Sequence, residues 1–200
     1  MANAPNRPAV DVKGLLTVGM PPTDVAGRPV PCDELFAPKG DRAATGGRHV
    51  GLYFSAHWCP PCRTFTPQLI HTYQRLKQEG KDFEIVFCSR DNDRREFDQY
   101  AAKMPWMRLP FRDGRVDRLM AEYHIQSIPT LVIVNEEGHV VSNNARMAIP
   151  HDADGNEYPW AAYNSKSSGR PTVLMMLAVA LVLGYAGHRL FSVRPPPMKL

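Results

Sequence analysis

Two cysteines separated by two prolines are the residues of this chain with the clearest chemical potential. Cys59 and Cys62 follow an apolar run over residues 49–54 and precede a stretch with helical character. A strand, a Cys-x-x-Cys pair and a helix in that order form the arrangement that thiol–disulfide chemistry uses. We expect the Cys59 sulfur at the helix N-terminus, where unpaired N–H groups and the helix dipole favour a thiolate. Cys62, about one turn further on, can then close a disulfide with it.

The intervening prolines suit the first turn of a helix. The N–H groups of a first turn have no partner within the helix, so Pro60 and Pro61 stiffen this turn at little cost. The sequence therefore predicts a helix over residues 61–78 that ends at Gly80, with a kink at Pro67.

Two other uses of a Cys-x-x-Cys pair are a zinc site and a static disulfide. A structural zinc site needs four ligands, usually including a second close pair. Cys32 and Cys88 are isolated in the sequence, and no histidine lies at finger spacing. A static disulfide would be unusual inside a cell. The pattern therefore favours a redox-active dithiol, without a metal.

Strand and helix patterns alternate along the chain. Strands are predicted at 49–54, 83–88, 130–135 and 139–142, and helices at 61–78, 94–103 and 116–123. Residues 105–111 read as a Pro-bounded aromatic loop, and residues 11–19 as an edge strand or a short helix. This order predicts an α/β fold with a mixed central β-sheet flanked by helices.

Composition excludes several function classes. Hydrophobic residues make up 44% of the chain and charged residues 22%, which allows a real core. The net charge of +4 comes from dispersed Lys and Arg without a basic stripe, so nucleic acid is a poor candidate partner. Four cysteines make no disulfide framework, and we find no secretory signal core near the N-terminus.

Motifs beyond the cysteine pair resemble the thioredoxin superfamily, and within it the tryparedoxins of kinetoplastid parasites and the related nucleoredoxins. They extend over about residues 25–162 and comprise Phe54-Ser55-Ala56, Trp58-Cys59-Pro60-Pro61-Cys62-Arg63, Phe65-Thr66-Pro67-Gln68-Leu69, Met104-Pro105-Trp106, Leu109-Pro110-Phe111, Ser127-Ile128-Pro129-Thr130-Leu131, Ala145-Arg146 and Tyr158-Pro159-Trp160. The resemblance implies a thioredoxin-like domain over residues 26–163, after an N-terminal extension over residues 1–25.

The resemblance also implies a reaction. Cys59 would attack a substrate disulfide, and Cys62 would resolve the mixed disulfide that results. The implied reductant is a low-molecular-weight dithiol, trypanothione, and the implied acceptors are peroxiredoxin-type peroxidases, with no cofactor besides the Cys59–Cys62 disulfide. Alternatives are a nucleoredoxin-like general protein disulfide reductase, a membrane-tethered redox-sensing adaptor, and a lumenal folding oxidase.

Roles for neighbouring residues follow from the same resemblance. Trp58 is expected to cover one side of the dithiol and to contact partners. Pro129 is expected to be cis and to face the dithiol, leaving the Ile128 backbone free to pair with an extended substrate. Arg63 would steer acidic substrates or stabilise the thiolate, although a solvated helix arginine is an equal alternative.

Tyr53 stands where thioredoxins carry a buried acid that moves protons for the second cysteine. A phenol is a poor base near neutral pH, so water or another group must accept the Cys62 proton. We expect Cys88 to be a buried small hydrophobe. Cys32 lies in a less defined segment, and a structural role is favoured over the alternative of a regulatory thiol. The acidic residues Asp91, Asp93 and Glu96 are read as helix caps and a solvated helix face.

The last part of the chain has a different character. A polar linker over residues 164–171 leads to an uncharged, apolar run, which predicts a C-terminal transmembrane helix over residues 172–191 and a short tail over residues 192–200. We expect a tail anchor that leaves the dithiol domain in the cytosol. The mitochondrial outer membrane is the first choice and the endoplasmic reticulum the second.

Overall fold

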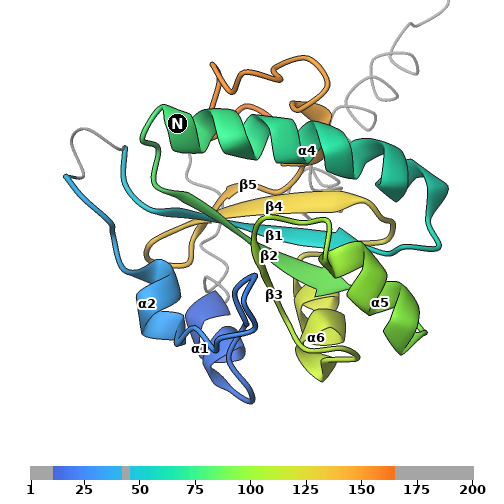
Figure 1. Ribbon diagram of the computed structural model, residues 1–200. Helices are drawn as coiled ribbons and strands as arrows, with labels where there is room; N and C mark the ends of the chain where they lie inside the picture. Colours follow the sequence, from blue (N-terminus) through green and yellow to red (C-terminus); the bar gives the residue numbers. More distant parts are fainter. Residues whose placement is uncertain (1–10, 42–45, 165–200) are drawn as a thin grey trace, which may run out of the picture. The chain divides into compact units, whose positions relative to one another are not determined.

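The computed structural model describes residues 11–41 and 46–164 and builds them on a five-stranded sheet with the strand order β3-β2-β1-β4-β5 (Figure 1). β1 (His49–Ser55) and β2 (Phe83–Ser89) run parallel, and β3 (Met107–Arg108) pairs in parallel with β2. β4 (Thr130–Asn135) is antiparallel to both β1 and β5 (Val140–Ser142). The predicted mixed α/β sheet is confirmed.

Helices cover both faces of this sheet, because the central strands are apolar on both sides. Tyr53 of β1 packs with α4 (Pro60–Gln78) and α5 (Arg94–Ala101). Val50, Leu52 and Phe54 pack with the other three helices. These are α1 (Val12–Thr17), α2 (Cys32–Phe36) and α6 (Gly114–Glu122), which lie below the sheet in Figure 1, while α4 lies above it. A short 3-10 helix, η1 (Ala145–Met147), follows β5.

One segment differs from its sequence-based expectation, and a second is decided between two alternatives. Met107 and Arg108 form the edge strand β3, although residues 105–111 were expected as a loop. Two residues are too few to show a strand period, and their partners lie far away in the sequence: Arg108 pairs with Phe87 of β2 and with Thr23. Of the two possibilities for residues 11–19, the helix is correct, since Val12–Thr17 forms α1.

The described part of the predicted N-terminal extension belongs to the domain. Val12 and Leu16 are fully buried in the core cluster that also contains α6 residues. The buried guanidinium of Arg115 at the start of α6 donates a 2.8 Å hydrogen bond to the Leu16 carbonyl and a second one to the Met20 carbonyl. An arginine far along the chain thus holds the end of α1.

At the other end, the predicted linker beyond Asn164, the transmembrane helix over 172–191 and the tail over 192–200 lie outside the described residues. Among the helices of residues 11–41 and 46–164, none is long and apolar enough to cross a membrane.

Candidate active site

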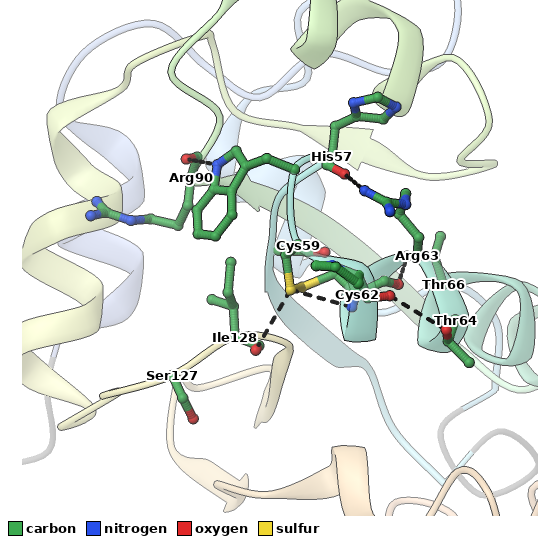
Figure 2. Close-up of a disulfide and its surroundings, with 12 residues drawn as sticks. His57, Cys59, Cys62, Arg63, Thr64, Thr66, Arg90, Ser127 and Ile128 are labelled. Carbon is green, nitrogen blue, oxygen red and sulfur yellow. Dashed lines mark hydrogen bonds between the residues drawn. A yellow bond between two sulfur atoms is a disulfide. The ribbon is translucent and has the colours of Figure 1, made fainter.

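Cys59 and Cys62 lie at the start of α4, where they form a disulfide with a Cα–Cα distance of 5.2 Å (Figure 2). Cys59 is the N-cap of α4, and Pro60 and Pro61 occupy the first two helical positions, as predicted. The Cys62 N–H donates to the Cys59 sulfur over 3.3 Å. An N–H group and the helix dipole therefore both point at this sulfur, which stabilises a negative charge there.

The two sulfurs differ in their access to solvent. Cys59 retains 4% of its surface and Cys62 none, so only Cys59 can be reached from outside without a rearrangement. The Cys59 sulfur lies 3.8 Å from the Ile128 carbonyl oxygen, which faces it in Figure 2. The bond between Ile128 and Pro129 is cis, as predicted. The Ile128 backbone thus borders the disulfide on the side opposite the helix.

Trp58 is 49% exposed beside the disulfide, so it is a surface residue and not a core tryptophan. Its indole N–H donates to the Arg90 carbonyl over 3.0 Å, and the Arg90 N–H donates to the Ser55 carbonyl over 2.9 Å. The loop after β2 therefore fixes the segment that leads into Cys59.

Asp91 adds a third connection between these two loops. Its carboxylate accepts the His57 N–H over 2.7 Å and the Ser89 hydroxyl over 2.8 Å, and the residue is almost completely buried. Burial raises the pKa of the Asp91 carboxyl, while the bonds from Ser89 and His57 oppose that shift. The sequence reading of Asp91 as a cap or solvated residue is wrong, whereas Asp93 does cap α5 through the N–H groups of Arg95 and Glu96.

Four buried hydroxyl groups, from Tyr53, Ser55, Thr66 and Tyr100, form a hydroxyl cluster under the start of α4. The Thr66 hydroxyl lies 2.8 Å from Tyr53 Oη and 2.5 Å from Tyr100 Oη, and it donates to the Cys62 carbonyl over 2.9 Å. The Ser55 hydroxyl lies 3.0 Å from Tyr100 Oη. Burial, and after it the neighbouring Tyr100, raise the pKa of Tyr53, so its phenol stays neutral. A neutral phenol donates hydrogen bonds here and cannot act as a base.

Arginines near the dithiol already have partners. Arg63 is exposed and donates from its guanidinium to the His57 carbonyl over 2.8 Å, as Figure 2 shows. The side chain of Arg90 forms an ion pair with Asp117 of α6. A role of Arg63 in steering substrates or stabilising the thiolate stays a prediction.

The other two cysteines and the acidic groups of the described residues are arranged differently from the dithiol. Cys32 and Cys88 are buried and unbridged, and burial raises the pKa of both thiols, which keeps them protonated. Within the described residues, no group of three or more His, Cys, Asp or Glu side chains is arranged to hold a metal ion.

Sequence reasoning missed Asp91, Arg90, Ser55, Thr66 and Tyr100 as members of the site. Each reaches it through a contact between segments 13 to 45 residues apart in sequence, apart from the link of Thr66 to Cys62. The sequence signal that could have indicated Asp91 was its position as a polar residue just after a buried strand. This position was interpreted as a helix cap instead.

A family model described as thioredoxin-like matches residues 46–140. Mouse nucleoredoxin is 45% identical over 115 residues, which cover 57% of this chain and 26% of that protein. The tryparedoxin of Trypanosoma brucei brucei is 42% identical over 116 residues, which cover 57% of this chain and 80% of that protein. The chain thus spans about a quarter of the length of the mouse nucleoredoxin it matches and most of the tryparedoxin.

Among solved structures, a tryparedoxin II complexed with glutathionylspermidine superimposes with a TM-score of 0.65 at 34% identity. The match covers 75% of this chain and 98% of that one.

Proposed function

Because the chain belongs to the thioredoxin-like oxidoreductases, the family that includes the tryparedoxins and the nucleoredoxins, we propose that it catalyses thiol–disulfide exchange through Cys59 and Cys62. One observation carries the proposal. The Cys59–Cys62 disulfide caps α4, and its outer sulfur lies next to the Ile128 carbonyl.

The reaction requires two exchange steps. The Cys59 thiolate attacks one sulfur of a substrate disulfide, forms a mixed disulfide and releases the other substrate sulfur as a thiolate. The Cys62 thiolate then attacks the Cys59 sulfur, forms the Cys59–Cys62 disulfide and releases the second substrate thiolate. Two electrons pass from the enzyme to the substrate in one cycle, and an external thiol must return them.

Each neighbour of the dithiol has a task in these steps. The Cys62 N–H and the dipole of α4 stabilise the Cys59 thiolate before attack. The Ile128 backbone binds an extended substrate segment, and Trp58 offers it an apolar surface. The proton of Cys62 passes to water, because the buried Tyr53 phenol cannot accept it.

We further propose that the electron donor is a glutathione–polyamine dithiol, trypanothione, and that the acceptors include peroxiredoxin-type peroxidases. The 80% coverage of the Trypanosoma brucei brucei tryparedoxin and the likeness to a tryparedoxin II that carries glutathionylspermidine support the donor class. The second candidate is a general protein disulfide reductase with another donor, which the 45% identity to mouse nucleoredoxin favours.

A comparison of donors separates the two candidates. The oxidised full chain is mixed in parallel with trypanothione, with glutathione and with thioredoxin reductase plus NADPH, and the formation of free thiols is followed. Preferential reduction by trypanothione supports the tryparedoxin-like function, whereas preference for another donor moves the function to the general reductase. Cys59→Ser is the blank.

A trapping experiment tests the order of attack. Cys62→Ser is expected to stop after the first step and accumulate a mixed disulfide through Cys59 with a peroxidase or a model disulfide substrate. Cys59→Ser is expected to accumulate none, because Cys62 is fully buried. Mass spectrometry of the products under non-reducing conditions identifies the bridged cysteine. Equal trapping by both variants would contradict the assignment of Cys59 as the nucleophile.

We also propose that residues 172–191 anchor the chain in a membrane, with the dithiol domain in the cytosol. The mitochondrial outer membrane is the preferred candidate. Residues 172–187 are apolar and carry no charge, and Arg189 follows near the end of the run, which supports the proposal. The test is extraction of cell membranes with alkaline carbonate, comparing the full chain with a chain that stops at residue 165. Release of both chains into the supernatant would end this proposal and leave the dithiol function untouched.

A further inference from the structure

A pocket of about 390 Å³ lies between the N-terminal segment, α5 and the loop that follows β3. Most of its lining consists of apolar side chains and prolines, among them Met20, Pro21, Phe97, Leu109, Pro110 and Phe111. Small-molecule sites in proteins have volumes of roughly 300–1,000 Å³, with apolar walls and a few polar groups that orient the ligand. This pocket has both properties.

Of the charged side chains in the lining, Arg94 and Asp98 pair with each other, and Arg108 has no partner of opposite charge among the described residues. Arg94 and Asp98 face each other in an ion pair with an Nε–Oδ2 distance of 2.9 Å, so their charges cancel. The half-buried guanidinium of Arg108 makes neither a hydrogen bond nor an ion pair with any of the residues that the structure describes. A guanidinium that has lost part of its hydration gains most from an anion, and its planar fork matches a carboxylate.

Contacts within the lining and from residues outside it hold the walls of the pocket. Arg115 holds the Met20 carbonyl, and the Arg112 guanidinium donates to the Asn92 carbonyl over 2.7 Å. The Phe111 ring packs against Phe97 with a centroid distance of 5.6 Å. The pocket is therefore formed before any ligand arrives, which reduces the ordering cost of binding.

The backbone around Arg108 limits the kind of ligand. Arg108 donates its N–H to the Thr23 carbonyl and accepts the Thr23 N–H, both over 2.9 Å. The outer edge of β3 is thus already paired, and an extended peptide cannot add to it as a strand. The pocket suits a compact group that enters between the side chains.

We propose that this pocket binds a small organic acid with an apolar body, whose carboxylate pairs with Arg108 and whose body contacts Met20, Phe97 and Phe111. None of the lining residues belongs to the dithiol site, so the proposal is independent of thiol–disulfide exchange.

A matched pair of probes tests the proposal on the full chain. 3-Phenylpropionate carries the carboxylate, and 3-phenylpropionamide has the same size and apolar ring without the charge. Titrations followed by ligand-observed NMR are expected to show saturable binding of the acid and about tenfold weaker binding of the amide, as loss of a charge-assisted pair predicts. Arg108→Gln is expected to weaken binding of the acid by about the same factor and to leave binding of the amide unchanged.

Arg118→Gln is the matched control, because Arg118 is an exposed arginine of α6 outside the pocket lining. It is expected to bind the acid like the unmodified chain. Circular dichroism checks that Arg108→Gln is folded, and if it is not, the comparison of acid with amide on the unmodified chain decides. Equal binding of acid and amide, or no saturable binding of the acid up to about 10 mM, overturns the proposal.

Discussion

Asp91 is a carboxylate that the fold buries next to the segment leading into Cys59. It accepts the His57 N–H and the Ser89 hydroxyl, and no cation pairs with it among these contacts. Because burial raises its pKa, the charged form of Asp91 costs stability in the folded chain. The same carboxylate connects the His57 backbone with the Ser89 side chain at the end of β2.

This cost predicts a pH dependence. In the unfolded chain Asp91 loses its proton at a pH of about 3.9, and in the folded chain at a higher pH. Between the pKa of Asp91 in the unfolded chain and its higher pKa in the folded chain, the unfolded state binds fewer protons than the folded state. The free energy of unfolding therefore falls as the pH rises through this window, and it stays lower above it. Asp91→Asn keeps an acceptor for the His57 N–H and cannot ionise. Urea unfolding at several pH values is expected to show the unmodified chain losing stability relative to Asp91→Asn as the pH rises through the window.

A stability difference between the two chains that stays constant with pH would contradict the assignment. Asp98→Asn is the control, because Asp98 is an exposed carboxylate on the next helix, α5. A fall that appears in the comparison with Asp91→Asn and not in the comparison with Asp98→Asn is specific to the buried carboxylate.

Thr66 is the centre of the hydroxyl cluster, and it supports a second prediction. Thr66→Val keeps the shape of the side chain but removes the Thr66 hydroxyl from Tyr53 and Tyr100 and the donor from the Cys62 carbonyl, while Tyr100 keeps its contact with Ser55. Unfolding by urea is expected to show a loss of about 1–3 kcal/mol. Thr64→Val is the matched control on the exposed side of α4 and is expected to stay within about 0.5 kcal/mol. Equal losses for the two variants would mean that the cluster adds nothing to stability.

At the scale of elements, α1 illustrates how a short helix becomes part of the core. Six residues are too few for a stable isolated helix, so α1 depends on its contacts with the domain. Leu16 supplies an apolar contact, and the Arg115 guanidinium binds the Leu16 carbonyl at the C-terminal end of the helix.

Truncation of Leu16 tests this dependence. Leu16→Ala removes a side chain that is 1% exposed and is expected to lower the free energy of unfolding by about 2–5 kcal/mol in urea titrations. Val18→Ala, at a site that is 62% exposed just after the helix, is expected to change it by less than about 0.5 kcal/mol. Small and similar changes for both variants would place α1 outside the cooperative fold.

The same elements show what the sequence predicts well. β1, β2, β4 and α4 have long apolar patterns or clear caps, and their observed bounds lie within about two residues of the predicted ones. β3 was missed, because its two residues become a strand only by pairing with Phe87 and Thr23. The kink predicted at Pro67 stays a prediction, and the helix assignment continues through this residue.

The residues of the candidate site also fall into those that the sequence predicted and those that it did not. Local motifs placed Cys59 and Cys62 correctly on α4, and the family resemblance placed the cis bond before Pro129. Asp91 and Tyr100 could not be found in this way, because their roles arise when the end of β1 and the residues after it meet the loop after β2 and α5. Spacing along the chain carries no information about such contacts.

On the scale of the whole molecule, the sheet separates the dithiol from a buried ion pair. Ser55 and Ser89, at the ends of β1 and β2, are paired next to the dithiol loops, whereas His49 and Phe83 pair at the other end. Arg48, just before β1, donates to Asp82 over 2.5 Å, and both side chains are almost completely buried. The reactive dithiol therefore lies at one end of the sheet, and the buried Arg48–Asp82 ion pair lies at the other.

This separation predicts that stability can change without a change in reactivity. Asp82→Ala leaves the Arg48 charge buried and is expected to lower the free energy of unfolding by about 3–5 kcal/mol. At a temperature where the variant is folded, the rate of Cys59 alkylation by iodoacetamide after reduction is expected to equal that of the unmodified chain. A changed alkylation rate in a folded variant would show that the two ends of the sheet are coupled.

The N-terminal segment also affects how the molecule behaves among its own copies. A free sheet edge exposes N–H and C=O groups that can recruit a strand from another molecule, and short, covered edges prevent this. β5 has three residues and an irregular register with β4, while β3 has two residues and is covered by Thr23. Strand-by-strand aggregation therefore has little to start from at either edge while residues 21–30 stay in place. If that segment detached, β3 would become a free sheet edge that could recruit a strand from another molecule.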